Sequence, residues 1–447
     1  MFILRGPYVN QPRSRGLAKF RPLPLLAALA AVPAWSQTAP PPAAAASATE
    51  ATEKNSRSEA QQLQTVAITA NRRKELAKDV AGAVSVLGGA RLDELGATGV
   101  ADMAAYVPGL VVSGTRTGAQ QIAIRGITTG IDQTNSTVGM YIDESPVSFN
   151  SSYSGGSTLT VDPDPLDIER VEVLKGPQGS LYGASALGGL VKYVMVSPDL
   201  TSFNGRAEIG INKVSGGGAG NAVRAAINVP LVTNLLAVRA SAYRREEAGY
   251  LDNVASGKTD INKLNVSGGT ISVLLKPSAA FNARLTADTQ TITGQDNSTP
   301  QADVLTLKPA YGSLLNVGWQ LPINPSRSEQ NRANLALNYD AGFATLLSST
   351  SYFRGKSDTA VDLTPTSGSL AALFGANTVN FPITLDNKKA TQELRLTSPG
   401  GRSLDWLVGA FYTEEKVAGF NGMDFLVGPA GGPFTTVVPG VVTFYYG

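Results

Sequence analysis

Hydrophobic and polar residues alternate one by one over most of the second half of the chain. Near residue 209, for example, Ala207, Ile209 and Ile211 alternate with Arg206 and Glu208. A period of two residues predicts β-strands with one apolar and one polar face. When the apolar face meets lipid and the polar face meets an aqueous lumen, this is the pattern of a transmembrane β-barrel.

Loop lengths distinguish such a barrel from a soluble β-sandwich, whose strands alternate as well. We expect nine strands, at 203–214, 219–230, 234–247, 262–276, 280–293, 329–340, 342–356, 387–398 and 403–417. Short turns fall at 230–234, 277–280, 340–342 and 398–403, and long polar loops at about 247–262, 294–328 and 357–386. Short and long connections alternate strictly, as periplasmic turns and extracellular loops do.

The preceding block, Val80–Val196, reads as a small mixed α+β domain. Its β-branched and apolar runs predict strands at 85–87, 111–112, 122–124, 139–142 and 171–174. Helices are predicted at 90–95 and 99–106, and Pro108-Gly109 ends the second of them. Gly, Ser, Thr and Asn fill the loops between these elements.

The N-terminus resembles an export signal. A basic stretch precedes the apolar run Leu23–Ala34, and Ala34 and Ser36 are small residues before a cut at Gln37. A membrane anchor is disfavoured, because the run holds two prolines and is shorter than the roughly 20 residues that a spanning helix needs. We expect a signal peptide at 1–36 and a flexible Pro/Ala-rich tether at 37–62.

A short strand-forming segment, Leu63–Ala70, follows the tether. Thr65, Val66 and Ile68 are β-branched, and no neighbouring segment offers an evident partner strand. An unpaired strand of this kind can add to the edge of another protein's sheet. The alternative is an ordinary first strand of the next domain.

Composition narrows the possible functions. The chain has 447 residues, a net charge of +2, 16% charged residues, and no Cys or His. Disulfides, His-based triads and His or Cys metal sites are therefore impossible. The balanced charge argues against a nucleic-acid partner. We expect no enzyme activity, no cofactor and no metal site.

Three motifs in the mixed domain resemble the plug domain of TonB-dependent outer-membrane receptors. They are Ile122–Gly126, Val138–Asp143 and Glu169–Gly183, and both their order and their spacing match. Two departures are visible. Glu144 stands where the family usually has Gly, and Lys175 stands where Arg is commoner. Lysine keeps the charge but loses the bidentate fork of arginine.

The resemblance implies a domain order and several residue roles. It implies a TonB box at 63–70, a plug at 71–200 and a partial barrel at 201–447. The box, gripped by the TonB energy-transducing protein, would comprise Thr65, Val66, Ala67, Ile68, Thr69 and Ala70. The plug signature and locking residues would be Arg125, Gly126, Asp143, Glu169, Arg170, Glu172, Lys175, Gly176, Pro177, Gly179, Tyr182 and Gly183. Arg125 and Lys175 would face acidic residues of the surrounding barrel.

The resemblance also implies active uptake of a scarce ligand through the outer membrane of a Gram-negative bacterium, with membrane lipid around the barrel. An iron–siderophore complex is the commonest cargo of the family. Cobalamin and oligosaccharides remain alternatives. Arg116, Tyr141 and Tyr153 are candidate ligand contacts. A passive porin would lack the plug, and a signal-transducing receptor would need a folded domain before the box.

The strand count leads to a further expectation. Plugged transporters have 22 strands, and about nine are predicted here. We therefore expect an incomplete barrel, an open sheet curved around the plug. A truncated, non-functional receptor fragment is the alternative to a working importer.

Overall fold

A computed structural model gives the structure of this protein. It describes residues 67–69, 72–73, 75–80, 82–116, 118–129, 136–151, 154–155, 159–294, 300–303, 305–320, 326–401, 403–430, 432–438 and 443–446. They belong to one compact unit, Thr65–Gly447. The predicted signal peptide and tether lie outside the described residues. Within the described ranges, no helix has both the length and the apolarity to cross a membrane.

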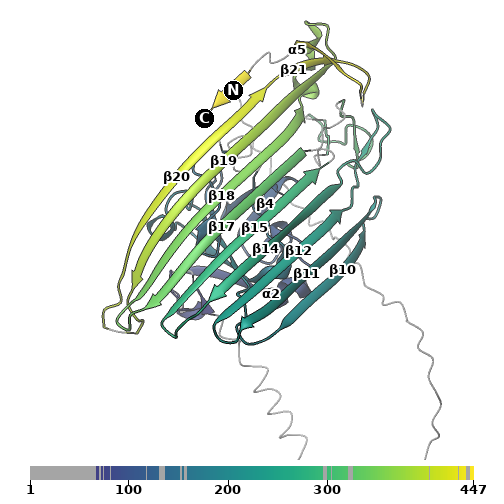
Figure 1. The fold of residues 1–447 in the computed structure, drawn as a ribbon. Coiled ribbons are helices and arrows are strands. Elements are labelled where there is room, and N and C mark those ends of the chain that lie inside the picture. Colours follow the sequence, from purple (N-terminus) through teal and green to yellow (C-terminus); the bar gives the residue numbers. More distant parts are fainter. Residues whose placement is uncertain are drawn as a thin grey trace, which may run out of the picture. The chain divides into compact units, whose positions relative to one another are not determined.

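A large antiparallel sheet dominates this unit (Figure 1). Its long strands are β10 (Asn204–Lys213), β11 (Ala219–Val232), β12 (Leu236–Glu247), β14 (Leu264–Leu275), β15 (Phe281–Gly294), β17 (Ser326–Asp340), β18 (Thr345–Asp362), β19 (Thr378–Thr397) and β20 (Leu407–Gly422). Each pairs with the next in this order. All nine predicted strands are confirmed, with ends shifted by several residues.

Shorter elements lie at the end of the sheet that carries the long loops. They are β21 (Asp424–Val427), β22 (Thr435–Val438), β23 (Thr443–Tyr446), the loop pair β13 (Asp252–Asn253) and β16 (Asn316–Val317), and helix α5 (Thr364–Ala372). On the described part of the chain, β10 pairs with β11 alone. The barrel is therefore partial, as expected.

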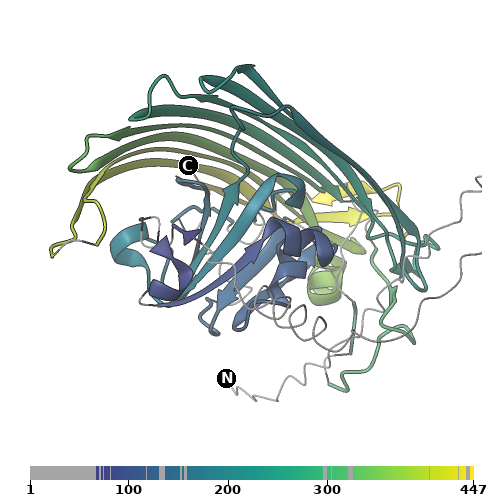
Figure 2. The same ribbon diagram turned by 90° about the horizontal axis from the view of Figure 1, so that it is seen from below.

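The two faces of the sheet differ as the alternation predicts. On β17 the inward side chains Gln330, Arg332 and Asn334 are buried, whereas the outward Leu335 is 38% exposed. Figure 2 shows the sheet curving over the smaller domain, which contacts its concave face. The polar inner face thus meets the plug, and the outer face is apolar, which is the pattern typical of transmembrane barrel strands.

The plug is built on a five-stranded sheet in the order β3–β8–β9–β6–β7. These strands are β3 (Ala83–Gly88), β8 (Ile168–Lys175), β9 (Gly189–Met195), β6 (Val138–Ile142) and β7 (Ser145–Pro146). The hairpin β4 (Leu110–Arg116) and β5 (Ala119–Ile124) and the helices η1 (Ala77–Asp79), α2 (Gly89–Glu94), α3 (Val100–Ala104), η2 (Pro165–Asp167) and α4 (Gly179–Tyr182) complete it. Strand β9 has no counterpart in the sequence prediction.

The plug core draws one side chain from the barrel. Leu92, Val100, Ile124 and Val191 belong to the main buried cluster of the plug, and Phe353 of β18 is part of the same cluster. The ring of Phe353 lies 5.6 Å from that of a plug phenylalanine, Phe149. Barrel and plug therefore share one apolar core at this point.

The segment predicted to have no local strand partner has one. Strand β1 (Ala67–Ile68) pairs antiparallel with β2 (Glu75–Leu76), seven residues further on. Between the two strands the Arg72 N–H donates to the Thr69 carbonyl at 3.0 Å, and Arg72 takes a positive φ of 59°. The expectation of an unpaired strand is wrong, because a tight reversal brings a partner from the segment immediately following.

Candidate functional site

The segment after the predicted tether is anchored on the plug. We call residues 67–73 the coupling segment; of the predicted TonB box, Thr65, Val66 and Ala70 lie outside the described residues. Ile68 is fully buried and packs with Tyr182 and Leu190. The backbone N–H of Thr69 donates to the Glu172 carboxylate at 3.1 and 3.2 Å.

Glu172 and Tyr182 hold Thr69 from both sides. The Thr69 hydroxyl also donates to Glu172, at 3.3 Å, and the Tyr182 hydroxyl donates to the Thr69 carbonyl at 3.3 Å. Glu172 is fully buried, and its carboxylate also accepts from Arg170 Nε at 2.8 Å. A buried carboxylate that lost these donors would be costly, so Glu172 favours the anchored position of the segment.

Arg72 is the second anchor. Its guanidinium lies 4.1 Å from the ring centroid of Tyr182 and 5.1 Å from that of Tyr141. It forms ion pairs with Glu144 at 2.8 Å and with Glu393 of β19 at 3.2 Å. Burial by itself lowers the pKa of Arg72, but the two carboxylates more than offset this and raise the pKa above its ordinary value.

Five charged groups form one cluster here. The ion-pair cluster consists of Arg72, Glu144, Lys192, Glu393 and Arg395. The Glu144 carboxylate accepts from Arg72 at 2.8 Å, from Lys192 at 3.0 Å and from Arg395 at 3.2 Å. Although burial alone raises the pKa of Glu144, these three cations hold it well below its ordinary value. The cluster joins the coupling segment, the plug and barrel strand β19 through one carboxylate.

A cavity of about 920 Å³ lies beside the cluster, toward the short turns of the sheet. Arg72, Glu144, Lys192 and Arg395 line it, together with an ion pair of 2.6 Å between Asp143 and Arg284 of β15. Its walls come from the coupling segment, the plug and the sheet. If the coupling segment were displaced, the space it vacates would therefore become continuous with this cavity.

Three further plug carboxylates pair with barrel arginines. Asp162 and Asp164 each lie 3.6 Å from Arg245 of β12, and Asp167 lies 2.8 Å from Arg239 of the same strand. The resemblance implied the reverse polarity, with plug cations facing barrel acids. In these pairs the acids belong to the plug and the cations to the barrel.

Arg125 and Lys175 have other surroundings than expected. Among the described residues, no acid forms an ion pair with either. Arg125 lies in a turn with φ of 54°, followed by Gly126 at 75°. Burial and the nearby Arg125 guanidinium lower the pKa of Lys175, so the two cations are neighbours. The expected contact with barrel acids is absent from the part of the chain that the structure describes.

The rest of the plug signature forms a turn and a short helix. Gly176 takes a φ of 106°, and α4 begins at Gly179, two residues after Pro177. Gly183 ends the helix with a φ of 75°, a conformation that favours glycine. The exposed Glu169 forms an ion pair with its neighbour Arg170. These residues position Tyr182, whose ring packs edge-on against Tyr141 at 5.1 Å.

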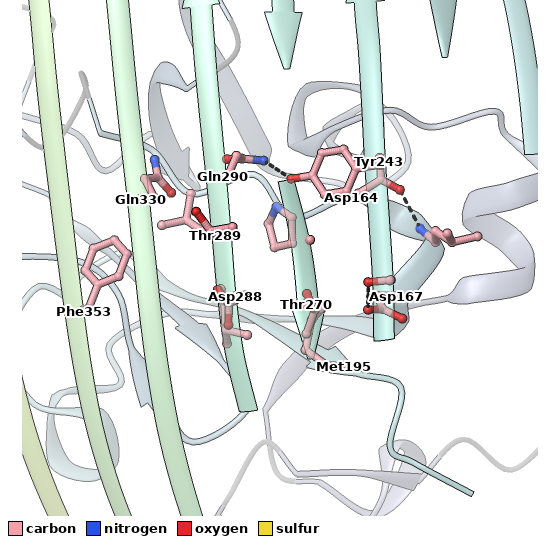
Figure 3. Close-up of a pocket in the computed structure, with 16 residues that line it drawn as sticks. Asp164, Asp167, Met195, Tyr243, Thr270, Asp288, Thr289, Gln290, Gln330 and Phe353 are labelled. Atoms are coloured by element: carbon pink, nitrogen blue, oxygen red, sulfur yellow. Dashed lines mark hydrogen bonds between the residues drawn. The ribbon is translucent and has the colours of Figure 1, made fainter. Parts of the chain in front are cut away.

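A second cavity separates the plug segment 159–167 from the sheet (Figure 3). Its volume is about 40 Å³, which is room for a few waters and too small for a chelate. Gln290 Nε2 donates to the Tyr243 hydroxyl at 2.8 Å and to the Asp162 carbonyl at 2.7 Å. Asp167 accepts from the Ser241 hydroxyl. This region fastens the plug to the sheet.

The three predicted ligand contacts, Arg116, Tyr141 and Tyr153, differ in what the structure describes of them. Tyr141 is 3% exposed, and its hydroxyl donates to the Tyr182 carbonyl at 2.9 Å. The plug sheet buries Tyr141 beside the coupling segment in this structure, and its role as a ligand contact stays a prediction. Arg116 lies at the end of β4, and nothing of its side chain is described; Tyr153 lies outside the described residues.

Sequence reasoning missed most of the ion-pair cluster. Glu144 was noted only as a departure from the family pattern. Lys192 carried a signal, since it is a lone charge within the apolar run Gly189–Met195. Glu393 and Arg395 lie more than 300 residues from the coupling segment, and nothing in the sequence links them to it.

Comparison with known proteins identifies the smaller domain. Residues 77–190 match the family model of the TonB-dependent Receptor Plug Domain. The chain is 27% identical to the pesticin receptor of Yersinia pestis over 227 residues, 50% of this chain and 31% of that protein. It is 31% identical to the vitamin B12 transporter BtuB of Vibrio vulnificus over 135 residues, 30% of this chain and 21% of the transporter.

The fold is similar to that of the ferric yersiniabactin uptake receptor FyuA from Yersinia pestis. The TM-score is 0.63 at 19% sequence identity, covering 77% of this chain and 50% of that receptor. This chain thus spans half or less of the length of these three proteins.

Proposed function

We propose that this chain, which carries the plug domain of the TonB-dependent receptors followed by part of their barrel, acts in the energised uptake of a scarce ligand across a bacterial outer membrane. The observation that carries the proposal is the anchoring of the coupling segment. Ile68, Thr69 and Arg72 hold it on the plug and on barrel strand β19 at once. A segment that is held by a few specific contacts at the edge of a cavity can be displaced by a pulling force without unfolding the whole plug.

In this proposal the TonB energy-transducing protein adds its own strand to the coupling segment from the periplasm. Strand addition uses backbone hydrogen bonds, so the segment must first leave β2 and its side-chain anchors. Pulling then removes Arg72 from the ion-pair cluster. Glu144 and Glu393 would each lose one ion-pair partner beside the 920 Å³ cavity, and the link between the plug and the coupling segment would be broken, which favours rearrangement of the plug at this point.

The cargo we propose is a ferric chelate, the usual cargo of the family. Cobalamin is the second candidate, because the chain is 31% identical over 135 residues to a vitamin B12 transporter. Uptake of radioactive iron supplied as a siderophore complex, measured beside uptake of labelled cobalamin, separates the two. Competition of each cargo against the other identifies which one the receptor binds.

The coupling role is tested by Ile68→Pro in cells that take up cargo through a receptor containing this chain. Proline removes a backbone donor and fixes φ, so the added strand cannot pair. Energised uptake should be lost, while binding of cargo at the cell surface persists. The matched control is Ala45→Pro in the predicted tether, which should leave uptake unchanged. Normal uptake by Ile68→Pro would refute the coupling role.

A further inference from the structure

One buried carboxylate of the plug takes no part in anchoring the coupling segment. Asp162 is only 1% exposed. Its Oδ1 accepts a hydrogen bond at 2.8 Å from the backbone N–H of Val100, the first residue of α3. A Cβ atom on Gly99 would lie 2.3 Å from Oδ2, so the backbone before α3 packs directly against the carboxylate. Asp162 therefore depends on other protein groups, rather than on water, to balance its charge.

The cation that pairs with Asp162 is poorly placed to do so. Arg245 Nη2 lies 3.6 Å from Asp162 Oδ2, and Arg245 Nη1 lies 3.6 Å from a second buried carboxylate, Asp164. Among the described residues, neither of these two nitrogens has a hydrogen-bond acceptor. A buried ion pair offsets the loss of hydration only when it is close and well hydrogen-bonded. A guanidinium shared at 3.6 Å by two aspartates does not meet this condition.

The groups around Asp162 come from five parts of the chain. They are Asp102 of α3, Tyr193 of β9, Tyr243, Arg245 and Glu247 of β12, Asp164 of the same plug segment, and Arg224 of β11, which lies 3.6 Å from Asp164. Burial is the main reason that the pKa of Asp162 rises to about 7. The carboxylates of Glu247 and Asp102 add to this rise, whereas Arg245 and the Val100 N–H reduce it.

Glu144, the other buried acid at the interface of plug and sheet, shows the opposite behaviour. Its three cations lie at 2.8, 3.0 and 3.2 Å, and they keep its pKa low in spite of burial. Close cations thus keep Glu144 ionised, while the distant Arg245 leaves Asp162 able to hold a proton. Two acids whose environments separate their pKa values in this way carry different roles.

We propose that Asp162 is a proton-binding site between the plug and barrel strand β12, and that the plug releases this proton to solvent when the two separate. In the packed plug, the neutral acid accepts the Val100 hydrogen bond without a buried charge. After separation, water hydrates the carboxyl group, its O–H bond ionises, and the carboxylate remains. The inference rests on the proposed function, because it takes this separation as part of the plug rearrangement during uptake.

The direction and size of the pH effect follow from linkage. A hydrated aspartate has a pKa of about 3.9, so the displaced plug binds fewer protons than the packed plug between about pH 4 and about pH 7. Separation should therefore become easier as the pH rises. The equilibrium constant for separation should increase about tenfold per pH unit, roughly a thousandfold in all, and level off above about pH 7.

Hydrogen exchange of the Val100 amide tests the proposal on the whole chain in detergent. Protection of this amide, corrected for the intrinsic pH dependence of exchange, reports how often the contact opens. It should fall about tenfold per pH unit from about pH 5 to about pH 7. Asp162→Asn, which is neutral at every pH, should abolish this slope. The matched control, Asp79→Asn, removes an exposed carboxylate of the plug and should keep the slope.

Infrared difference spectra detect the proton directly. Between about pH 8 and about pH 6, where carboxyl groups of ordinary pKa stay ionised, the parent should gain the carbonyl band of a protonated acid. Asp162→Asn should lack this gain, and Asp79→Asn should show it. A parent without the slope or without the band would overturn the proposal, even if Asp162→Asn did not fold. So would an Asp162→Asn variant that keeps either signal.

Both measurements are made without cargo and without the energy-transducing protein. A failure of the uptake experiments would therefore refute the proposed function and leave the proton site standing. A failure of the exchange and infrared experiments would remove the proton site and leave the uptake results untouched.

Discussion

Replacing Glu144 by glutamine should release the coupling segment. The change keeps the size of the side chain and removes the carboxylate that contacts Arg72, Lys192 and Arg395. The side chains of these three cations are only 3%, 2% and 9% exposed. They would remain buried, with Glu393 as the remaining carboxylate of the ion-pair cluster.

The size of the effect follows from this geometry. Removing one partner of a buried ion pair costs about 3–5 kcal/mol, because an uncompensated charge stays buried. Glu393 still pairs with Arg72 at 3.2 Å and with Arg395 at 2.8 Å, so we expect the lower end, about 3 kcal/mol. At about 1.4 kcal/mol per factor of ten, the equilibrium for leaving the anchored state shifts roughly a hundredfold.

The assay exploits the absence of cysteine from the chain. Ile68→Cys places a single thiol at a fully buried position of the coupling segment, since the sequence has Cys 0. Its rate of reaction with a maleimide reports how often the segment leaves the plug. Adding Glu144→Gln should raise that rate by roughly two orders of magnitude when opening and closing are fast compared with labelling. Denaturant unfolding in detergent measures the accompanying loss of stability.

Glu94→Gln provides the matched control. Glu94 forms an ion pair with Arg91 at 2.7 Å, but its side chain is 65% exposed. A solvent-exposed pair of this kind contributes less than about 1 kcal/mol, so labelling should hardly change. If Glu144→Gln behaved like Glu94→Gln, the ion-pair cluster would not hold the coupling segment, and the reasoning would be refuted.

Three other predictions concern pH and the plug. The pKa of Glu144 is lower in the folded than in the unfolded chain, so its contribution to stability is present above about pH 4.3 and is lost as the pH falls below that value; the acid limb of a stability–pH curve should flatten in Glu144→Gln. Burial raises the pKa of Asp162 to about 7, so the free energy of unfolding should fall as the pH rises from about 4 to about 7. Asp162→Asn should remove that slope in denaturant titrations. A methyl group on Gly99 would lie 2.3 Å from the Asp162 carboxylate, so Gly99→Ala should lower the free energy of unfolding by about 1–3 kcal/mol, whereas Gly82→Ala, with no atom within 4 Å, should not. The isolated plug, Val80–Val196, should show dispersed amide signals in NMR spectra, although it lacks the barrel's contribution to its core; the spectrum of an unfolded chain would contradict this.

The strands of the large sheet could be predicted from local pattern. Alternation determines which side chains share a face, and each strand needs only its own residues to display it. The nine long strands, and an apolar outer face, therefore follow from the sequence. The plug motifs could likewise be recognised, because turns such as Arg125–Gly126 and Gly176–Gly179 require particular residue types at fixed spacing.

Only the tertiary structure decided what those elements touch. The reversal that pairs β1 with β2 depends on a left-handed Arg72, which no local pattern favours. The ion-pair cluster joins Arg72 to Glu393, over 300 residues away, because the curvature of the sheet brings β19 against the plug. A charge shows its sign in the sequence, but its partner depends on which surfaces meet, so the pairing of plug acids with barrel arginines became visible only once the two domains were seen packed together.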